Sequence, residues 1–162
     1  MSEPLDLMAV APNLQRVLTL RVAIGPGVML GDSVDGWRCN YPIVGGDFDG
    51  VGVSGQVLAG GEDVFVLRAD GVGQLDARYS LRTDQGEVIN LRNRGVLAMT
   101  EYGRQLERNG QWPIPETEYR CTCTPVFHVP KGRLDWLTRS SFIGLVQYPS
   151  AEQVVIRCYR FY

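Results

Sequence analysis

The fold is decided by residues 63–95, which read DVFVLRADGVGQLDARYSLRTDQGEVINLRNRG. Apolar and polar side chains alternate in three runs of this stretch, at 63–70, 75–83 and 87–95, as in β-strands that bury one face. The runs are separated by Asp70-Gly71 and by Asp84-Gln85-Gly86, which are residues that tolerate positive φ or favour tight turns. The stretch therefore predicts three consecutive antiparallel strands.

The same pattern continues on both sides of this stretch. Valine and glycine occur nineteen times each, against eight alanines, a composition typical of strands interrupted by turns. Further strand-like runs lie at 14–24, 51–59, 119–126, 142–148 and 153–162, with turn signals at 25–27, 45–47, 60–61 and 109–110. Only 100–108 and 134–139 suggest short helical turns.

So many antiparallel strands would leave long exposed edges in an open sheet, and we therefore expect the sheet to close. The prediction is an all-β fold, a single domain over residues 1–162 that forms a closed or nearly closed antiparallel β-barrel. A barrel of this size is comparable to a lipocalin and has room for one small ligand. No linker or internal repeat divides the chain.

Charge and apolar patterning exclude several classes of protein. Lys and Arg total 16 and Asp and Glu total 18, so the formal charge of −2 gives no reason to bind nucleic acid. Residues 1–8 lack the positive start and the apolar stretch of a signal peptide, and no apolar run approaches the roughly 18 residues of a membrane span. We therefore expect a cytoplasmic protein with no membrane association.

The cysteines and the single histidine do not form a recognisable metal site. Thiols stay reduced in the cytoplasm, so Cys39, Cys121, Cys123 and Cys158 are interpreted as small buried side chains. Cys121 and Cys123 share one face of a strand, but His128 has the opposite parity and a zinc site needs about four ligands. The glycine-rich segments do not open helices after strands, so we expect neither a metal nor a cofactor.

The register of the central strands predicts which side chains face the cavity. If Asp70 pairs with Leu75, and Thr83 with Glu87, one face collects a mostly apolar set with a few polar groups, as ligand pockets do. The residues predicted to face the cavity are Val64, Val66, Arg68, Asp70, Leu75, Ala77, Tyr79, Leu81, Ile89, Leu91 and Asn93.

The opposite face of these strands would form the exterior. It holds charged side chains, Asp63 and Asp76 among them, together with Phe65 and Leu67. Apolar side chains exposed among charges suggest self-association, for which a dimer is the commonest symmetric solution, so we expect a homodimer. Because the side chains of a strand alternate between faces, a slip of one residue would exchange the interior and exterior sets.

Several segments of the chain resemble one family of proteins. The matching segments are 41–50, 55–63, 68–71, 75–79, 83–86, 93–95, 124–127 and 136–137. In order and spacing they are similar to the proteins grouped as domain of unknown function 3237, over roughly residues 14–162. The resemblance implies a compact antiparallel β-barrel that often self-associates and accompanies small-molecule metabolism. Where the family usually has Trp and Arg, this chain has Val64 and Thr122, which implies a larger pocket and a less anionic ligand.

Two kinds of function suit such a cavity. As a cofactor-free enzyme, the barrel would act by proton transfer on a neutral, moderately hydrophobic metabolite, as an isomerase, cyclase, hydratase or lyase does. Asp70 would then be the general base, and Tyr79 with Asn93 would stabilise an oxyanion. Alternatively, the barrel binds such a metabolite without turning it over. Both hypotheses need the same apolar cavity, so the sequence leaves them open.

The candidate site residues also have structural interpretations. Asp70 precedes Gly71 and is the kind of residue that caps a tight turn, while Arg68 would lower the pKa of its carboxyl and weaken it as a base. His128 lies near a strand end with no nucleophile at a diagnostic spacing. Beside the catalytic pair Asp70 and Tyr79, the predicted substrate-binding residues are Arg68, Asn93, Val64, Val66, Leu81, Leu91 and Thr122.

Overall fold

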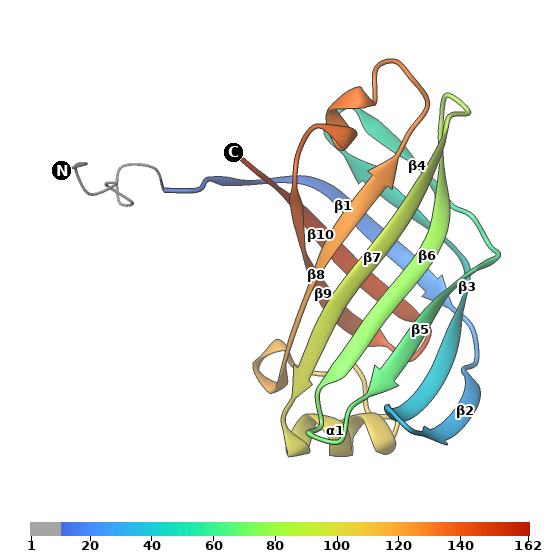
Figure 1. Cartoon of the computed structure of the whole chain (residues 1–162), viewed down its shortest axis with the longest axis vertical. Helices are drawn as coiled ribbons and strands as arrows, with labels where there is room; N and C mark the ends of the chain where they lie inside the picture. Colours follow the sequence, from blue (N-terminus) through green and yellow to red (C-terminus); the bar gives the residue numbers. More distant parts are fainter. Residues whose placement is uncertain (1–10) are drawn as a thin grey trace.

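The computed structural model describes residues 11–162 and shows a closed antiparallel β-barrel (Figure 1). The strands are β1 (Leu14–Ile24), β2 (Val28–Ser33), β3 (Gly36–Gly50), β4 (Val53–Val57), β5 (Gly61–Leu67), β6 (Gly73–Thr83), β7 (Val88–Met99), β8 (Tyr119–His128), β9 (Phe142–Ser150) and β10 (Gln153–Phe161). One helix, α1 (Glu101–Arg108), and two 3₁₀ turns, η1 (Glu116–Glu118) and η2 (Asp135–Thr138), complete the described part. Residues 1–8, which the sequence analysis compared with a signal peptide, lie outside the described residues.

The barrel closes through β3. Neighbouring strands follow the order β1, β10, β9, β8, β7 and β6, and β3 pairs with β1 to complete the circuit. Between β6 and β3, β4 pairs with the last residues of β3 and β5 pairs with its first half. β2 pairs only with β3 and continues the line of β1. The predicted all-β barrel is confirmed, and no helix within residues 11–162 is long and apolar enough to cross a membrane.

The sequence pattern predicts neither β2 nor β3, because Gly45-Gly46-Asp47 is typical of a turn. In the structure Gly46 lies inside β3 with φ of 129°. A Cβ at this position would lie 2.0 Å from the carbonyl oxygen of Arg21 on β1. These glycines therefore let two strands cross closely where β3 changes partners, and the strand continues through them.

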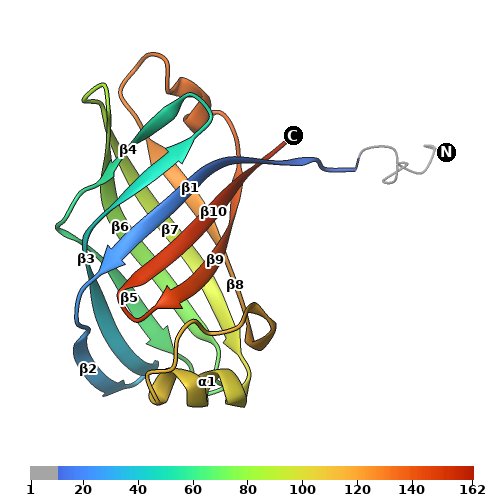
Figure 2. The ribbon, with the colours of Figure 1, turned by 180° about the vertical axis from the view of Figure 1, so that it is seen from behind.

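The barrel interior is packed at one end and hollow at the other. At the packed end, Leu134 and Leu137 from the β8–β9 connection join the core that contains Phe48, Leu81 and Ile89, and all five are almost fully buried. At the other end α1 lies across the barrel, as seen from both sides (Figures 1 and 2). Between these ends lies a cavity of about 730 Å³.

The predicted register of β6 and β7 is confirmed. Ala77 pairs with Asn93, Tyr79 with Leu91, and Leu81 with Ile89. Tyr79, Leu81 and Leu91 are buried in the barrel interior, as expected. The short turn between β6 and β7 permits few other registers of these strands. The Thr83 N–H closes this turn by donating to the Glu87 carbonyl oxygen at 2.8 Å.

The predicted register of β5 is wrong. Asp63 pairs with Ala77 and Leu67 with Gly73, so each β6 residue faces a β5 residue five positions earlier than expected. The loop occupies 68–72 in place of 71–74, and the Arg68 N–H closes it by donating to the Val72 carbonyl oxygen at 2.9 Å. Because five is odd, the two faces of β5 exchange. Phe65 and Leu67 line the cavity, so the apolar surface on which the dimer prediction rested does not exist.

Candidate functional site

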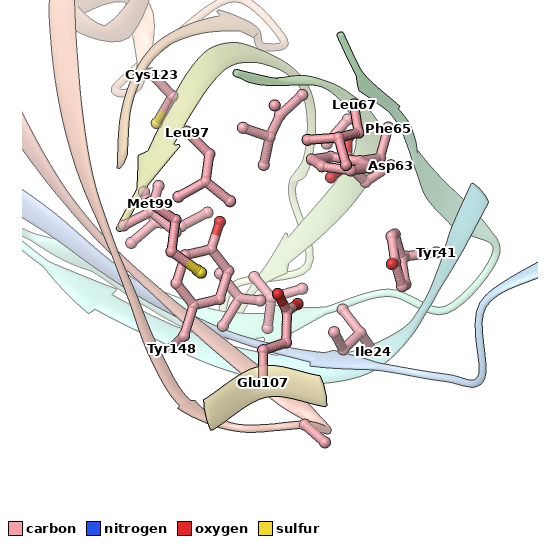
Figure 3. Close-up of a pocket in the computed structure, with 18 of the residues that line it drawn as sticks. Ile24, Tyr41, Asp63, Phe65, Leu67, Leu97, Met99, Glu107, Cys123 and Tyr148 are labelled. Atoms are coloured by element: carbon pink, nitrogen blue, oxygen red, sulfur yellow. The ribbon is translucent and has the colours of Figure 1, made fainter. Parts of the chain in front are cut away.

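The cavity is lined mainly by apolar side chains, with a small number of polar groups (Figure 3). Strands β1, β3 and β5 to β10 contribute to its wall, and α1 contributes to its open end. The titratable and amide side chains that line it are Tyr41, Asp63, Tyr79, Asn93, Arg104, Glu107, Arg108, Cys123 and Tyr148. A few placed polar groups in an apolar cavity are typical of a small-molecule site.

Three of these groups meet around Ala77. Asp63, Ala77 and Asn93 stand in one row across β5, β6 and β7, and neighbouring strands lie about 4.8 Å apart. Tyr79 lies two residues from Ala77 on the same face of β6. The methyl group of Ala77 is short, and the side chains of Asp63, Tyr79 and Asn93 all border the cavity around it. We call these three residues the polar triad.

Asp63 is the carboxyl group of the triad. Its Oδ1 accepts a hydrogen bond from the backbone N–H of Asp76 at 2.9 Å, and no cationic side chain within residues 11–162 pairs with it. Burial raises the pKa of Asp63 to about 6, against the opposing effect of the Asp76 N–H. A carboxyl group that titrates near neutrality can both accept and return a proton.

Tyr79 and Asn93 each carry a buried polar atom without a partner. Both residues are 6% exposed, and neither Tyr79 Oη nor Asn93 Oδ1 has a hydrogen bond within the described residues. Burial raises the pKa of Tyr79 far above its usual value, so the phenol keeps its proton. Since buried polar atoms are nearly always hydrogen-bonded to protein or to water, these two atoms beside the cavity are candidates to hydrogen-bond a bound molecule.

The tyrosines Tyr41 and Tyr148 of the wall, and the neighbouring Cys121, are held in neutral form. Tyr148 Oη lies 3.4 Å from Cys121 Sγ, and the Tyr41 ring meets Phe65 edge to face with 6.1 Å between centroids. Burial raises the pKa of both phenols, and it raises the pKa of the Cys121 thiol to about 12. Thiols with such pKa values stay protonated and unreactive. All four cysteines are buried, as expected.

The helix α1 closes part of the hollow end and is anchored at both its start and its middle. Thr100 caps the helix, accepting a hydrogen bond from the Gly103 N–H at 3.0 Å. Arg104 Nη2 donates to the carbonyl oxygens of Gly71 at 2.7 Å and Met99 at 3.3 Å, which ties the helix to the β5–β6 loop and the end of β7. From the last turn, Glu107 points into the cavity (Figure 3).

Asp70, predicted as the general base, lies outside the cavity lining. Its Oδ1 accepts a hydrogen bond from the Val72 N–H at 3.2 Å, and its other oxygen pairs with Arg68. The Val72 N–H, together with Arg68, lowers the pKa of Asp70, which is the opposite of what a base needs. Gly71 adopts φ of 83°, so Asp70-Gly71 is a capped turn, and Arg68 is not a cavity residue either.

The other predicted substrate-binding residues divide into two groups. Val64, Val66 and Thr122 belong to the outward face of their strands, because Asp63, Phe65 and Cys123 next to them line the cavity. The expectation of a larger, less anionic pocket rested on Val64 and Thr122 and loses that support. Leu81 and Leu91 face inward but lie in the packed core outside the cavity lining. Of the predicted catalytic and substrate-binding residues, Tyr79 and Asn93 line the cavity, and Leu75 and Ala77, which were predicted to face it, line it too.

The sequence reasoning missed Asp63, Glu107, Tyr41 and Tyr148. Asp63 shares one face of β5 with Phe65 and Leu67. This face is as apolar as the opposite face, which was predicted to point inward. An acid in an otherwise apolar alternation is the signal that could have identified it. Glu107 and Tyr148 come from α1 and β9, and only the three-dimensional fold brings them to β5.

Comparisons with known proteins agree on the fold. The model of the family described as "Protein of unknown function (DUF3237)" matches residues 12–161. A UPF0311 protein of Rhodopseudomonas palustris is 34% identical over 141 residues, covering 86% of this chain and 90% of its own. A UPF0311 protein of Clostridium acetobutylicum is 28% identical over 149 residues, covering 91% and 93%.

Solved structures show the same barrel. The crystal structure of a conserved protein of unknown function from Rhodopseudomonas palustris has a TM-score of 0.86 at 28% identity, covering 95% of this chain and 100% of that one. A β-barrel-like protein from Acinetobacter baumannii has a TM-score of 0.81 at 25% identity, covering 94% and 98%. A structure described as an enzyme from Penicillium herquei has a TM-score of 0.69 at 18% identity, covering 100% and 99%, a likeness of fold alone.

Proposed function

Since the chain belongs to the DUF3237 family, whose description specifies no reaction, we propose its function from the site: a cofactor-free enzyme of small-molecule metabolism that acts by proton transfer. Its substrate is a neutral, moderately hydrophobic metabolite held in the cavity, and the reaction is of the isomerase, cyclase, hydratase or lyase type. The observation that carries the proposal is the buried Asp63 carboxyl, with a pKa raised to about 6, beside two unpartnered polar atoms.

Each member of the polar triad has a role that its chemistry supports. Asp63 takes or gives the proton, because its carboxyl group lies in apolar surroundings and titrates near neutrality. Tyr79 Oη donates a hydrogen bond to oxygen that gains negative charge, as in an oxyanion hole. Asn93 presents its Oδ1, an acceptor, so it orients a donor group of the substrate and does not stabilise an oxyanion.

Two further considerations support an enzyme over a binding protein. A binding cavity needs its polar anchors but gains nothing from an unneutralised carboxyl group, which costs stability when ionised. The structural neighbour from Penicillium herquei is described as an enzyme, so this barrel architecture is compatible with catalysis. The binding protein remains the alternative that the following experiment tests.

The test uses 5-nitrobenzisoxazole, a neutral aromatic probe whose ring opens when a base removes its C3 proton. The C–H electron pair forms the nitrile, the N–O bond breaks, and the coloured phenoxide leaves, so the reaction needs no co-reactant. Wild-type protein should accelerate this reaction, with kcat/KM rising as pH increases through about 6, where Asp63 ionises. Loss of a general base costs about 10²- to 10⁴-fold on natural substrates, and we expect Asp63→Asn to lose at least about tenfold on this probe.

Asp70→Asn is the matched control, since it removes the same charge from an exposed turn. It should leave the rate unchanged, while binding of neutral N-phenyl-1-naphthylamine to Asp63→Asn shows that the cavity is intact. Wild-type rates no higher than those of Asp63→Asn would overturn the proposal and favour the binding protein.

A further inference from the structure

Glu107 is a second carboxyl group directed at the cavity, and it comes from a different wall than Asp63. Asp63 projects from β5, whereas Glu107 projects from α1 into the space between Tyr148 and Tyr41 (Figure 3). Glu107 as a whole residue is exposed at the open end, yet partial desolvation of its carboxyl raises the pKa, and Arg108 and Arg104 oppose the effect.

The Glu107 carboxylate has no hydrogen bond or ion pair within residues 11–162, although two arginines flank it on α1. Arg104 donates to the carbonyl oxygens of Gly71 and Met99, and Arg108 pairs with Glu101 at 2.6 Å. Both neighbouring cations therefore have other partners. The carboxyl group faces the ligand space without an ion pair, and the two arginines act on its charge only at longer range.

The helix holds Glu107 in a defined place. The Thr100 cap and the two hydrogen bonds of Arg104 fix α1 against the β-strands. A Cβ at Gly103 would lie 2.8 Å from Met99 Cγ and 3.0 Å from the Glu118 carbonyl oxygen, so the helix approaches β7 and η1 closely at this glycine. The anchored helix therefore fixes the backbone position from which Glu107 reaches the cavity.

Asp63 and Glu107 face the same space. Both carboxyl groups raise the pKa of Tyr41 and of Tyr148, so these two phenols lie within electrostatic reach of each acid. The principal cause of the raised pKa is burial for each carboxyl group. Two separated carboxyl groups in different surroundings can divide the roles of base and acid.

We infer that Glu107 is the second catalytic residue of this cavity, a general acid that protonates the substrate from the α1 side while Asp63 acts from β5. This inference rests on the proposed function. It assigns two proton transfers to the reaction: one position of the substrate loses a proton to Asp63, and another gains a proton from Glu107. Solvent then returns a proton to Glu107 and removes one from Asp63.

Two probes that differ in their leaving group distinguish the acid from the base. In 5-nitrobenzisoxazole the departing phenoxide is stable without a proton, whereas in unsubstituted benzisoxazole it is more basic and gains from protonation as the N–O bond breaks. Asp63 would accept the C3 proton of either probe, and Glu107 would donate its proton to the phenoxide oxygen of the second, giving 2-cyanophenol.

We expect Glu107→Gln to lower kcat/KM for unsubstituted benzisoxazole by about tenfold or more and to change the 5-nitro reaction less than about threefold. It should also remove the fall in rate at high pH that deprotonation of the acid causes with the poorer probe. Asp63→Asn should slow both reactions equally. Glu62→Gln, a loss of the same charge on the exterior of β5, is the matched control and should behave as wild type.

The two possible failures are distinguishable. If Glu107→Gln slows both probes equally, or neither, while Asp63→Asn remains defective, Glu107 is not the acid and the proposed function stands. If Asp63→Asn matches wild type on both probes, the proposed function fails and the inference fails with it. Unchanged melting temperature and N-phenyl-1-naphthylamine binding in Glu107→Gln show that a defect is not one of folding.

Discussion

Asp63→Asn should make the protein more stable at neutral pH. The carboxyl group has a pKa of about 6 in the folded protein against a usual 3.8, so the folded state binds this proton more tightly than the unfolded chain. A raised carboxyl pKa therefore favours folding only while the group is protonated. The resulting destabilisation is absent below about pH 4, grows between the two pKa values, and is complete above about pH 6.

The size of the effect follows from the same two values. A difference of about two pKa units corresponds to up to roughly 3 kcal/mol at pH 7. Asparagine is neutral at every pH and keeps an oxygen that can accept the Asp76 N–H, so the variant avoids this penalty without losing the hydrogen bond. In a chain of this length, 3 kcal/mol would raise Tm by roughly 5–10 °C.

Urea unfolding at pH 4, 5, 6, 7 and 8, followed by tryptophan fluorescence, measures the prediction. The free energies of unfolding of wild type and Asp63→Asn should coincide near pH 4 and separate as pH rises, the variant being the more stable. Effects of other titrating groups cancel in the difference. A variant less stable than wild type at pH 7, or a difference that does not change with pH, would refute the account of Asp63 as a buried carboxyl without a counter-charge.

Three other variants test separate parts of the structure. Tyr79→Phe removes a buried hydroxyl that has no hydrogen-bond partner, so the free energy of unfolding in urea should stay unchanged or rise by about 1 kcal/mol. The same variant should turn over any oxyanion-forming substrate more slowly. A marked loss of stability would show that the hydroxyl is hydrogen-bonded. Ala77→Leu places a larger side chain among the polar triad and should abolish N-phenyl-1-naphthylamine fluorescence while the far-ultraviolet circular dichroism stays that of the barrel; retained binding would place the ligand elsewhere. Thr100→Ala removes the N-terminal cap of α1, which contributes about 1 kcal/mol. Hydrogen exchange of the α1 amides should become faster in this variant, while exchange of the β6 amides stays unchanged. An equal increase in exchange rate in α1 and β6 would contradict an independently anchored helix.

Local patterning was sufficient for the fold class and for the part of the cavity wall that β6 and β7 form. β1 spans the residues that the alternation predicts, and the β6–β7 hairpin has the expected pairs because a short turn leaves the register little freedom. The helix α1 also appears where Thr100 and the following residues predict a helical turn. These features depend on interactions between residues close in sequence.

The errors arise where the outcome depends on longer loops or distant contacts. Alternation fixes the spacing of side chains on β5 but not which set is buried, since Val64 and Val66 are as apolar as Phe65 and Leu67. The position and length of the loop after β5 determine which set is buried. Because the observed register differs from the predicted one by an odd number of residues, Asp63 takes the place of Arg68 as the polar cavity residue. At Gly46 the sequence could not distinguish a turn from a continuous strand, because a glycine that allows a turn also allows two strands to approach closely.

The separation of a packed end from a hollow end shapes how barrels of this kind can diverge. Substitutions around Leu81 or Leu137 leave voids or clashes in a filled core and are removed by selection for folding. Substitutions at positions such as Leu97 or Met99 border the cavity, so we expect them to cost less stability. A lineage can thus replace one ligand with another by changing side chains at one end, while the opposite end preserves the architecture through the transition.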